Sequence, residues 1–290
     1  MTVVETSCGP VEYEMSGTGA PVVVLHGSPG GIDAAALMAR ILPTDHVASI
    51  VLSRPGYLGT PLESGRTPDE QADLVIALLD ALGVDQAGVF TWSGSGPMGY
   101  RLAARYPGRV SALVAFAALS KEFVEPRPGL SDRLLFETGA GRRLVRTLVK
   151  YRPNDIVAGA LSGESSLRGD ELAAAVAHAV SDPAARSFIL DLTPTAFRDR
   201  TRRSGYENDL AQFAALGSLE LAGITTPTLV IQGTADTDVT PDHSAYAVEQ
   251  ISGAELLSLA GGSHFALFAH PDAASAQRRV VDFLTASASS

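Results

Sequence analysis

The residues best suited to chemistry lie between positions 89 and 99, in the stretch V-F-T-W-S-G-S-G-P-M-G. Its β-branched and aromatic start is typical of the end of a strand, and a helix is predicted over 98–106, ending before Pro107. A serine between such a strand and helix, with small residues two positions away on either side, indicates a nucleophile elbow. In that turn a strained backbone exposes the serine hydroxyl above the sheet. Ser93 occupies the central position.

The small positions of this pattern leave an alternative. They hold Thr91 and Ser95 in place of glycine, and Ser95 could itself be the nucleophile. Ser95 would then lie inside the first turn of the helix, with Pro97 at its outer small position, whereas Ser93 ends the strand as an elbow requires. We therefore assign the nucleophile to Ser93. A serine that only caps a buried helix would leave the residues described next without a role.

A serine hydroxyl is a weak nucleophile at neutral pH and needs an adjacent base. His264 follows the last predicted strand in the glycine-rich stretch G-G-S-H-F, from which its side chain can reach across the carboxyl edge of a sheet. His270 is the nearest alternative, but Pro271 at the first position of a helix indicates a capping role. The other histidines are expected at structural or exposed positions: His26, His46, His178 and His243. His264 is therefore the candidate base.

The base in turn needs a carboxylate that orients it. In open α/β sheets such a group follows the carboxyl end of a strand. The predicted strand 227–232 is followed by G-T-A-D-T-D, which offers Asp236 and Asp238. We assign Asp236, because it lies nearer the strand end and Asp238 falls further into the loop. The resulting chain order of serine, aspartate and histidine is the order expected for a nucleophile elbow above a parallel sheet.

Negative charge that develops on a carbonyl oxygen needs preorganised donors, and loss of one typically removes about 3–4 kcal/mol of transition-state stabilisation. One expected donor is the N–H that follows the nucleophile, here that of Gly94, and the other comes from the loop after an earlier buried strand. The loop H-G-S-P-G-G, residues 26–31, follows the apolar run 21–25, and the Ser28 N–H is its best candidate. His26 is interpreted as a structural residue that shapes this loop.

The elements that must position these residues alternate between strands and helices. Strand candidates over 3–6 and 11–15 form a hairpin-like opening, and later apolar runs are typical of strands buried in a parallel sheet. These runs cover residues 21–25, 47–52, 87–91, 110–119, 227–232 and 255–259. Helices are predicted over 240–251 and 271–284, and over 67–83, where Thr67, Pro68 and Glu70 form a capping box. The pattern predicts an α/β fold around a parallel sheet.

Between Ser120 and Gly217 this alternation is lost. Apolar residues recur at helical spacing over 130–151, 171–180 and 206–216. The segment is broken by prolines: Pro126, Pro128, Pro153, Pro183 and Pro194. We predict a core formed by residues 1–119 and 218–290, and a helical cap formed by residues 120–217 that lies across one end of the sheet. The tail 286–290 is expected to fray.

Composition restricts the class of protein. The chain has 290 residues and a net charge of −10, which disfavours nucleic acid and anionic membrane surfaces as partners. No apolar run reaches the length of a membrane span and no secretory signal is visible, so a cytoplasmic protein is expected. Cys8 is the only cysteine, which excludes an intrachain disulfide, and no metal or other cofactor is expected. A basic cluster is interpreted as a solvated helix face: Arg198, Arg200, Arg202 and Arg203.

Together these landmarks resemble the α/β-hydrolase superfamily over nearly the whole chain. The resemblance is carried by L-H-G-S-P-G-G, S-R-P-G-Y-L-G-T, F-T-W-S-G-S-G-P, R-Y-P-G-R-V, P-T-L-V-I-Q-G-T-A-D and G-G-S-H-F. The stretch G-Y-E-N-D-L, residues 205–210, is similar to the helix that returns from the cap to the core. The resemblance implies an eight-stranded, mostly parallel sheet flanked by helices, with a helical cap insertion and the same three catalytic residues. The two small elbow positions depart from the family pattern, and so does Ser53, which stands where an acidic residue often precedes R-P-G-Y.

The expected function is that of a cofactor-independent serine hydrolase, which cleaves a small ester or thioester through an acyl-enzyme on Ser93. The pattern H-G-S-P-G is also similar to that of proline iminopeptidase-like enzymes, and cap carboxylates such as Glu122, Glu125 and Glu137 would then bind a substrate amine. Two other classes are alternatives. A carbon–carbon bond hydrolase or lyase could use the same triad. A non-catalytic binding protein on this fold is less favoured, because such proteins commonly lack a triad member and this chain has all three. The partner is expected to be a small-molecule substrate. The acyl and leaving groups stay open, as does assembly into a homo-oligomer.

Overall fold

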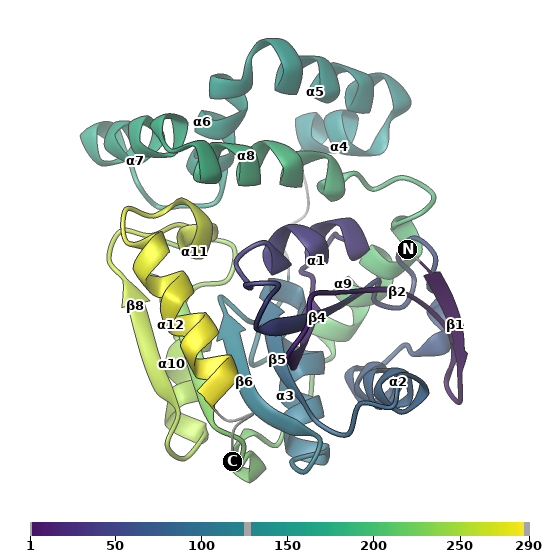
Figure 1. Ribbon diagram of the computed structural model, residues 1–290. Helices are drawn as coiled ribbons and strands as arrows, with labels where there is room; N and C mark the ends of the chain where they lie inside the picture. Colours follow the sequence, from purple (N-terminus) through teal and green to yellow (C-terminus); the bar gives the residue numbers. More distant parts are fainter. Residues whose placement is uncertain (1, 125–128, 287–290) are drawn as a thin grey trace.

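Eight strands form one sheet in the computed structural model, which describes residues 2–124 and 129–286 (Figure 1). The strands are β1 (Thr2–Thr6), β2 (Gly9–Ser16), β3 (Ala20–Leu25), β4 (Val47–Leu52), β5 (Ala87–Trp92), β6 (Val110–Phe116), β7 (Thr228–Gly233) and β8 (Glu255–Leu259). Their spatial order is β1-β2-β4-β3-β5-β6-β7-β8. The elbow strand β5 therefore lies inside the sheet, with strands on both sides.

The strands from β3 onward are parallel, and the opening hairpin is antiparallel. Strand β1 pairs with β2, which pairs with β4 in the same antiparallel sense. Each remaining pair is parallel, from β4 and β3 across to β7 and β8. Since β4, β5 and β7 are buried at every residue, their largely apolar sequences match their place inside the sheet. The mostly parallel eight-stranded sheet is as predicted.

Helices cover both faces of this sheet. One apolar core joins side chains of α1 (Ile32–Ala39) and α12 (Ala273–Ala286) to one set of alternating strand residues. A second core joins α2 (Pro68–Ala81), α3 (Gly96–Arg105) and α10 (Pro241–Gln250) to the opposite set. Val22 belongs to the first core and Val23 to the second, because successive side chains of a strand point to opposite faces.

The start of α2 has the capping box that the sequence predicts. The Thr67 side chain accepts a hydrogen bond from the Glu70 N–H, and the Glu70 carboxylate accepts one from the Thr67 N–H. Gly83 closes this segment in the left-handed region, with φ of 66°. By contrast, α1 and the short α11 (Ala266–Ala269) were not predicted.

Five helices lie above the sheet as a separate layer (Figure 1). They are α4 (Leu130–Glu137), α5 (Gly139–Tyr151), α6 (Pro153–Gly163), α7 (Gly169–Ser181) and α8 (Pro183–Leu192). Pro153 and Pro183 stand at breaks between helices, as the sequence suggested, and each begins the next helix, α6 or α8. Helix α9 (Arg203–Ala214) lies lower, beside the sheet (Figure 1). Pro126 and Pro128, like the tail residues 287–290, lie outside the described residues.

The interpretation of the basic cluster as a solvated helix face was wrong for Arg198 and Arg202. Both side chains are buried, and both precede α9 in a loop. Arg198 is paired with Asp132 of α4, and Arg202 with Asp33 of α1. These ion pairs tie the segment between the helical layer and α9 to its neighbours. Within the described part of the chain, no helix has the length and apolar character needed to cross a membrane.

Candidate active site

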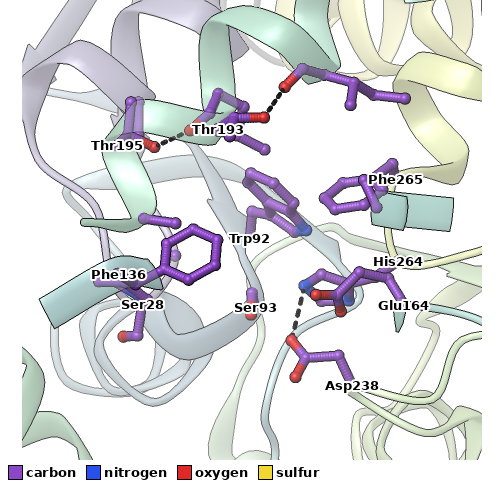
Figure 2. A pocket seen from close by; sticks show the side chains of 17 residues that line it. Ser28, Trp92, Ser93, Phe136, Glu164, Thr193, Thr195, Asp238, His264 and Phe265 are labelled. Carbon is purple, nitrogen blue, oxygen red and sulfur yellow. Dashed lines mark hydrogen bonds and ion pairs between the residues drawn. The ribbon is translucent and has the colours of Figure 1, made fainter. Parts of the chain in front are cut away.

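Ser93 stands directly after β5, at the first residue of a single 3-10 turn, Ser93–Ser95, that leads into α3. Its φ is 57°, a left-handed conformation that is strained for a residue with a side chain. A Cβ on Gly27 would lie 3.1 Å from the Ser93 Cβ, so the glycine leaves room for the serine. The Ser93 side chain faces a cavity (Figure 2). This is the geometry that the sequence pattern predicts for an elbow.

The alternative nucleophile, Ser95, is held inside the protein. Its side chain is fully buried, and its Oγ lies 2.6 Å from Thr91 Oγ1 and 2.9 Å from the Leu25 carbonyl oxygen. It also accepts a hydrogen bond of 3.1 Å from the Trp92 N–H. Ser95 is not among the described residues that line the cavity. Its hydroxyl thus joins the start of the helix to the strands below.

Thr91 fits at a position where glycine is common because a neighbouring residue is small. A Cβ on Gly99 of α3 would lie 2.9 Å from Thr91 Cγ2. The absence of a side chain at Gly99 therefore provides the space that the larger Thr91 fills. Thr91 and Ser95 occupy the two small positions of the elbow in place of glycine, and their hydroxyls are hydrogen-bonded to each other across the turn.

His264 and Asp236 are brought together as the sequence predicts. The His264 Nδ1 lies 2.8 Å from Asp236 Oδ2, and both side chains are buried. Asp236 also accepts hydrogen bonds from the N–H groups of Asp238 and Val239, at 2.9 and 3.0 Å, and from the Gln232 side chain at 3.2 Å. These donors fix the carboxylate, and the carboxylate fixes the imidazole ring.

Asp238 contacts the other nitrogen of the same ring, which the sequence did not predict. Its Oδ2 lies 3.2 Å from His264 Nε2 (Figure 2). Burial alone would lower the pKa of His264, but the carboxylates of Asp236 and Asp238 raise it to about 10. The imidazole thus lies between two carboxylates.

An aromatic side chain supports the ring of His264 from the elbow strand. Trp92 stacks on it with ring centroids 5.3 Å apart and an interplanar angle of 28°. Trp92 also packs on Phe116, Phe188, Phe265 and Phe268. Because Trp92 directly precedes Ser93, this stacking links the position of the His264 ring to that of the elbow.

The two predicted oxyanion donors, Ser28 and Gly94, are neighbours. A Cβ on Gly94 would collide with the Ser28 hydroxyl, so the residue after the elbow serine packs directly on the loop that follows β3. Ser28 lines the same cavity as Ser93 and His264. The residue that follows Ser93 and the loop after β3 are therefore in contact, and their role as oxyanion donors stays a prediction.

A buried ion pair holds the Ser28 loop. Arg54 and Asp209 form a bidentate pair, with Nη1–Oδ1 of 3.0 Å and Nη2–Oδ2 of 2.5 Å. The Ser28 hydroxyl donates a hydrogen bond to Asp209 and accepts one of 2.7 Å from Arg54. Tyr57 donates a further hydrogen bond, 2.6 Å long, to the same carboxylate. No role was predicted for Arg54 or Asp209, although both lie in stretches that carry the family resemblance.

His26 has the structural role that the sequence predicts. Its Nε2 accepts a hydrogen bond of 3.0 Å from the Arg54 N–H, and its Nδ1 donates one of 2.7 Å to the Gly27 carbonyl oxygen. Burial and the nearby Arg54 charge lower the pKa of His26 well below the ordinary value. The neutral ring joins the loop after β3 to the loop after β4.

The cavity above Ser93 has a volume of about 190 Å³. Helices α4, α6 and α8 of the upper layer contribute Phe136, Ala160 and Ile189 to its lining. Trp92 and Phe265 also line it (Figure 2). The lining is mostly apolar, with Ser93 and His264 at its base.

The acidic residues proposed from the sequence to bind an amine do not line this cavity. Glu137 lies 3.7 Å from Arg198, Glu122 is exposed, and Glu125 lies outside the described residues. The carboxylates that do line it are Glu164 and Asp238. Among the residues that the structure describes, no cluster of three metal-ligating side chains is present.

A sequence model of the family described as alpha/beta hydrolase fold matches residues 20–271. The chain belongs to the α/β-hydrolase family. A solved alpha/beta hydrolase fold protein from Nakamurella multipartita is 45% identical, covers 100% of this chain and 99% of its own, and superposes with a TM-score of 0.96. The uncharacterized hydrolase YcgS of Bacillus subtilis (strain 168) is 27% identical over 265 residues, 88% of each chain.

A further relative matches a shorter region. It is the 2-hydroxymuconate semialdehyde hydrolase of Pseudomonas sp. (strain CF600), 30% identical over 112 residues, which are 37% of this chain and 40% of that protein. Membership of the family and its hydrolase relatives identify this chain as an α/β-hydrolase enzyme.

Proposed function

We propose that this α/β-hydrolase is a cofactor-independent serine hydrolase that cleaves a small ester or thioester through an acyl-enzyme on Ser93. One observation carries the proposal. Ser93 has the left-handed backbone of an elbow and faces the same cavity as His264, whose Nδ1 is held by the buried Asp236. We assign these three residues as nucleophile, base and orienting carboxylate.

In the first half of the reaction, Ser93 Oγ forms a bond to the substrate carbonyl carbon while its proton passes to His264 Nε2. The electron pair of the carbonyl π bond moves to oxygen, where the N–H groups of Ser28 and Gly94 stabilise the charge. That pair then reforms the carbonyl and expels the alcohol or thiol, which takes the proton from His264. An acyl-enzyme remains.

In the second half, water replaces the leaving group. His264 Nε2 accepts a proton from the water, whose oxygen bonds to the acyl carbon, and the oxyanion forms again in the same place. When this intermediate collapses, Ser93 Oγ leaves and regains its proton from His264. The products are the carboxylic acid and the free enzyme.

The size and lining of the cavity favour a small substrate. Its volume of about 190 Å³ is below the ~300–1,000 Å³ of pockets that hold drug-sized ligands. Because α4, α6 and α8 contribute to the lining, we infer that the helices within residues 120–217 act as a cap that selects the acyl or leaving group.

Hydrolysis of short acyl esters and thioesters tests the proposal. Ser93→Ala and His264→Ala should each reduce kcat by about 10⁴–10⁶-fold, since removal of a triad member leaves only oxyanion and binding effects. Ser95→Ala is the matched control, because it removes a hydroxyl two residues away that does not face the cavity. Retained activity in Ser93→Ala, or its loss in a folded Ser95→Ala variant, would contradict the assignment.

A further inference from the structure

The side chains that line the cavity include more acidic groups than basic ones. Of the described residues that line it, Glu164 and Asp238 are acidic, and none is arginine or lysine. The only basic side chain in the lining is His264. Glu164 follows α6, and its main-chain carbonyl accepts a hydrogen bond of 3.1 Å from the His264 N–H. The described lining of the cavity therefore holds two acidic side chains and one basic side chain.

Asp238 differs from Asp236 in its exposure. The Asp236 side chain is fully buried, whereas 41% of the Asp238 side chain is accessible. Among the described residues, His264 is the only charged partner of the Asp238 carboxylate. Asp238 therefore presents a carboxylate to whatever enters the cavity, while Asp236 is enclosed behind the histidine.

The contact with Asp238 involves the atom that must serve as the base. Asp238 Oδ2 lies 3.2 Å from His264 Nε2, the nitrogen that must accept the Ser93 proton. A protonated imidazole paired with Asp238 cannot accept that proton. The carboxylate thus stabilises the inactive form of the base when no substrate cation is present.

We propose that Asp238 is a specificity-determining residue, which selects esters whose acyl part carries an ammonium group next to the carbonyl. The inference rests on the proposed serine-hydrolase function and names its substrate class. The substrate ammonium replaces the imidazolium as the partner of Asp238. His264 then loses its Nε2 proton to solvent and becomes available to Ser93.

The same charges disfavour acidic substrates. A carboxylate on the acyl group would meet Asp238 and Glu164, with no cationic side chain of the lining other than His264 to offset them. The compound in the name of the Pseudomonas relative is a carboxylic acid. We therefore expect this enzyme to differ in specificity from that relative.

An isosteric series of methyl esters tests the inference. The series CH3–CH(X)–COOCH3 carries an ammonium, methyl, hydroxyl or carboxylate group as X, so charge changes at nearly constant size. The kcat/KM values are compared at about pH 6.5, because α-amino groups titrate near ~7.7–8.0. Wild type should prefer the ammonium ester over the methyl ester by about tenfold or more, the effect of a partly screened charge pair. The carboxylate ester should be the poorest substrate.

Variants at Asp238 separate charge from structure. Asp238→Asn should remove most of the preference for the ammonium ester and increase kcat/KM for the methyl ester, since the base is no longer held as an ion pair. Asp238→Glu keeps the charge and should keep the preference. Asp242→Asn is the matched control, because Asp242 pairs with Lys121 outside the cavity and its loss changes the net charge equally.

The pH profile supplies a second readout. The charged groups that face His264 are Asp236 and Asp238 from the loop after β7 and Glu164 from the end of α6, all of them acidic. The acidic limb of kcat for the methyl ester should move to lower pH in Asp238→Asn. It should also lie at lower pH for the ammonium ester than for the methyl ester in wild type.

The outcomes distinguish this inference from the proposed function. If a fluorophosphonate labels Ser93 but the ammonium ester is not preferred, or if the preference persists unchanged in Asp238→Asn, the inference is wrong and the serine-hydrolase function stands. If Ser93 is not labelled and no ester in the series is hydrolysed, both are wrong. Loss of the preference in Asp238→Asn with retention in Asp238→Glu supports the inference.

Discussion

Replacement of Asp209 by alanine should destabilise the fold strongly, because it breaks a fully buried ion pair. The side chains of Arg54 and Asp209 are 1% and 2% exposed. The carboxylate also accepts hydrogen bonds from Tyr57 and Ser28. Asp209→Ala leaves the Arg54 guanidinium buried without a counter-charge. Removal of one partner of such a pair typically lowers the free energy of unfolding by about 3–5 kcal/mol.

Equilibrium unfolding in urea measures this loss, with a surface pair as the control. Asp191 pairs with Arg40 at 2.7 Å, but the two side chains are 44% and 55% exposed. Asp191→Ala should therefore change the free energy of unfolding by at most about 1 kcal/mol. A loss in Asp209→Ala no larger than in Asp191→Ala would show that the buried ion pair does not stabilise the fold.

A double variant tests the electrostatic origin of the effect. Arg54→Met combined with Asp209→Leu removes both buried charges, so it should be more stable than Asp209→Ala alone. If the double variant is as unstable as the single one, packing and the lost hydrogen bonds of Tyr57 and Ser28 explain the effect, and the buried charge does not. In either variant the Ser28 loop loses its anchor, so fluorophosphonate labelling of the elbow serine should be slower than in wild type.

Three further predictions concern the base and the elbow. The neighbouring carboxylates raise the pKa of His264 to about 10, and catalysis needs the neutral ring. The kcat for a neutral ester should therefore rise with pH toward that value. A pH profile of kcat that is already flat at neutral pH would contradict this prediction. Gly99→Ala should lower the free energy of unfolding by about 1–3 kcal/mol in urea, because the new Cβ would lie 2.9 Å from Thr91 Cγ2, and adding Thr91→Gly should restore part of it. If the double variant gains nothing, the close contact is not the cause. Ser95→Ala should lower the free energy of unfolding by about 1–3 kcal/mol, because the buried N–H of Trp92 loses its acceptor. Fluorophosphonate labelling of Ser93 should be unchanged in this variant. Loss of labelling in the folded variant would contradict this prediction.

Local sequence signals were sufficient for the sheet and for part of the helices. The capping box at Thr67 and the apolar runs of the parallel strands depend on residues close together in the sequence. Helices α6 and α8 were not predicted, although proline is favoured at the first helical position, which Pro153 and Pro183 occupy. At the second site the preceding Asp182 gives the missing signal, since its side chain accepts hydrogen bonds from the N–H groups of Ala184 and Ala185.

Contacts between distant segments were beyond the reach of sequence patterns. Arg198 and Arg202 are buried because Asp132 and Asp33 meet them from other elements, and spacing along the chain carries no sign of these pairs. The anchoring of Ser28 by Asp209 is of the same kind.

The position of Asp238 depends on the turn that precedes it. Asp236 Oδ1 accepts hydrogen bonds from the N–H groups of Asp238 and Val239, which folds the loop back on itself. Asp238 consequently reaches His264 Nε2, although its distance from the strand end suggested a place further away. Both aspartates were candidates from the sequence. The geometry of the turn determines which nitrogen of the His264 ring each of them contacts.

Covalent labelling with a fluorophosphonate measures whether Ser93 is an activated nucleophile. The modified peptide is mapped by mass spectrometry in wild type, Ser93→Ala and Ser95→Ala. We expect one label on Ser93, absent from Ser93→Ala and retained in Ser95→Ala. A label on Ser95, or a folded wild-type enzyme that takes up no label, would contradict the account.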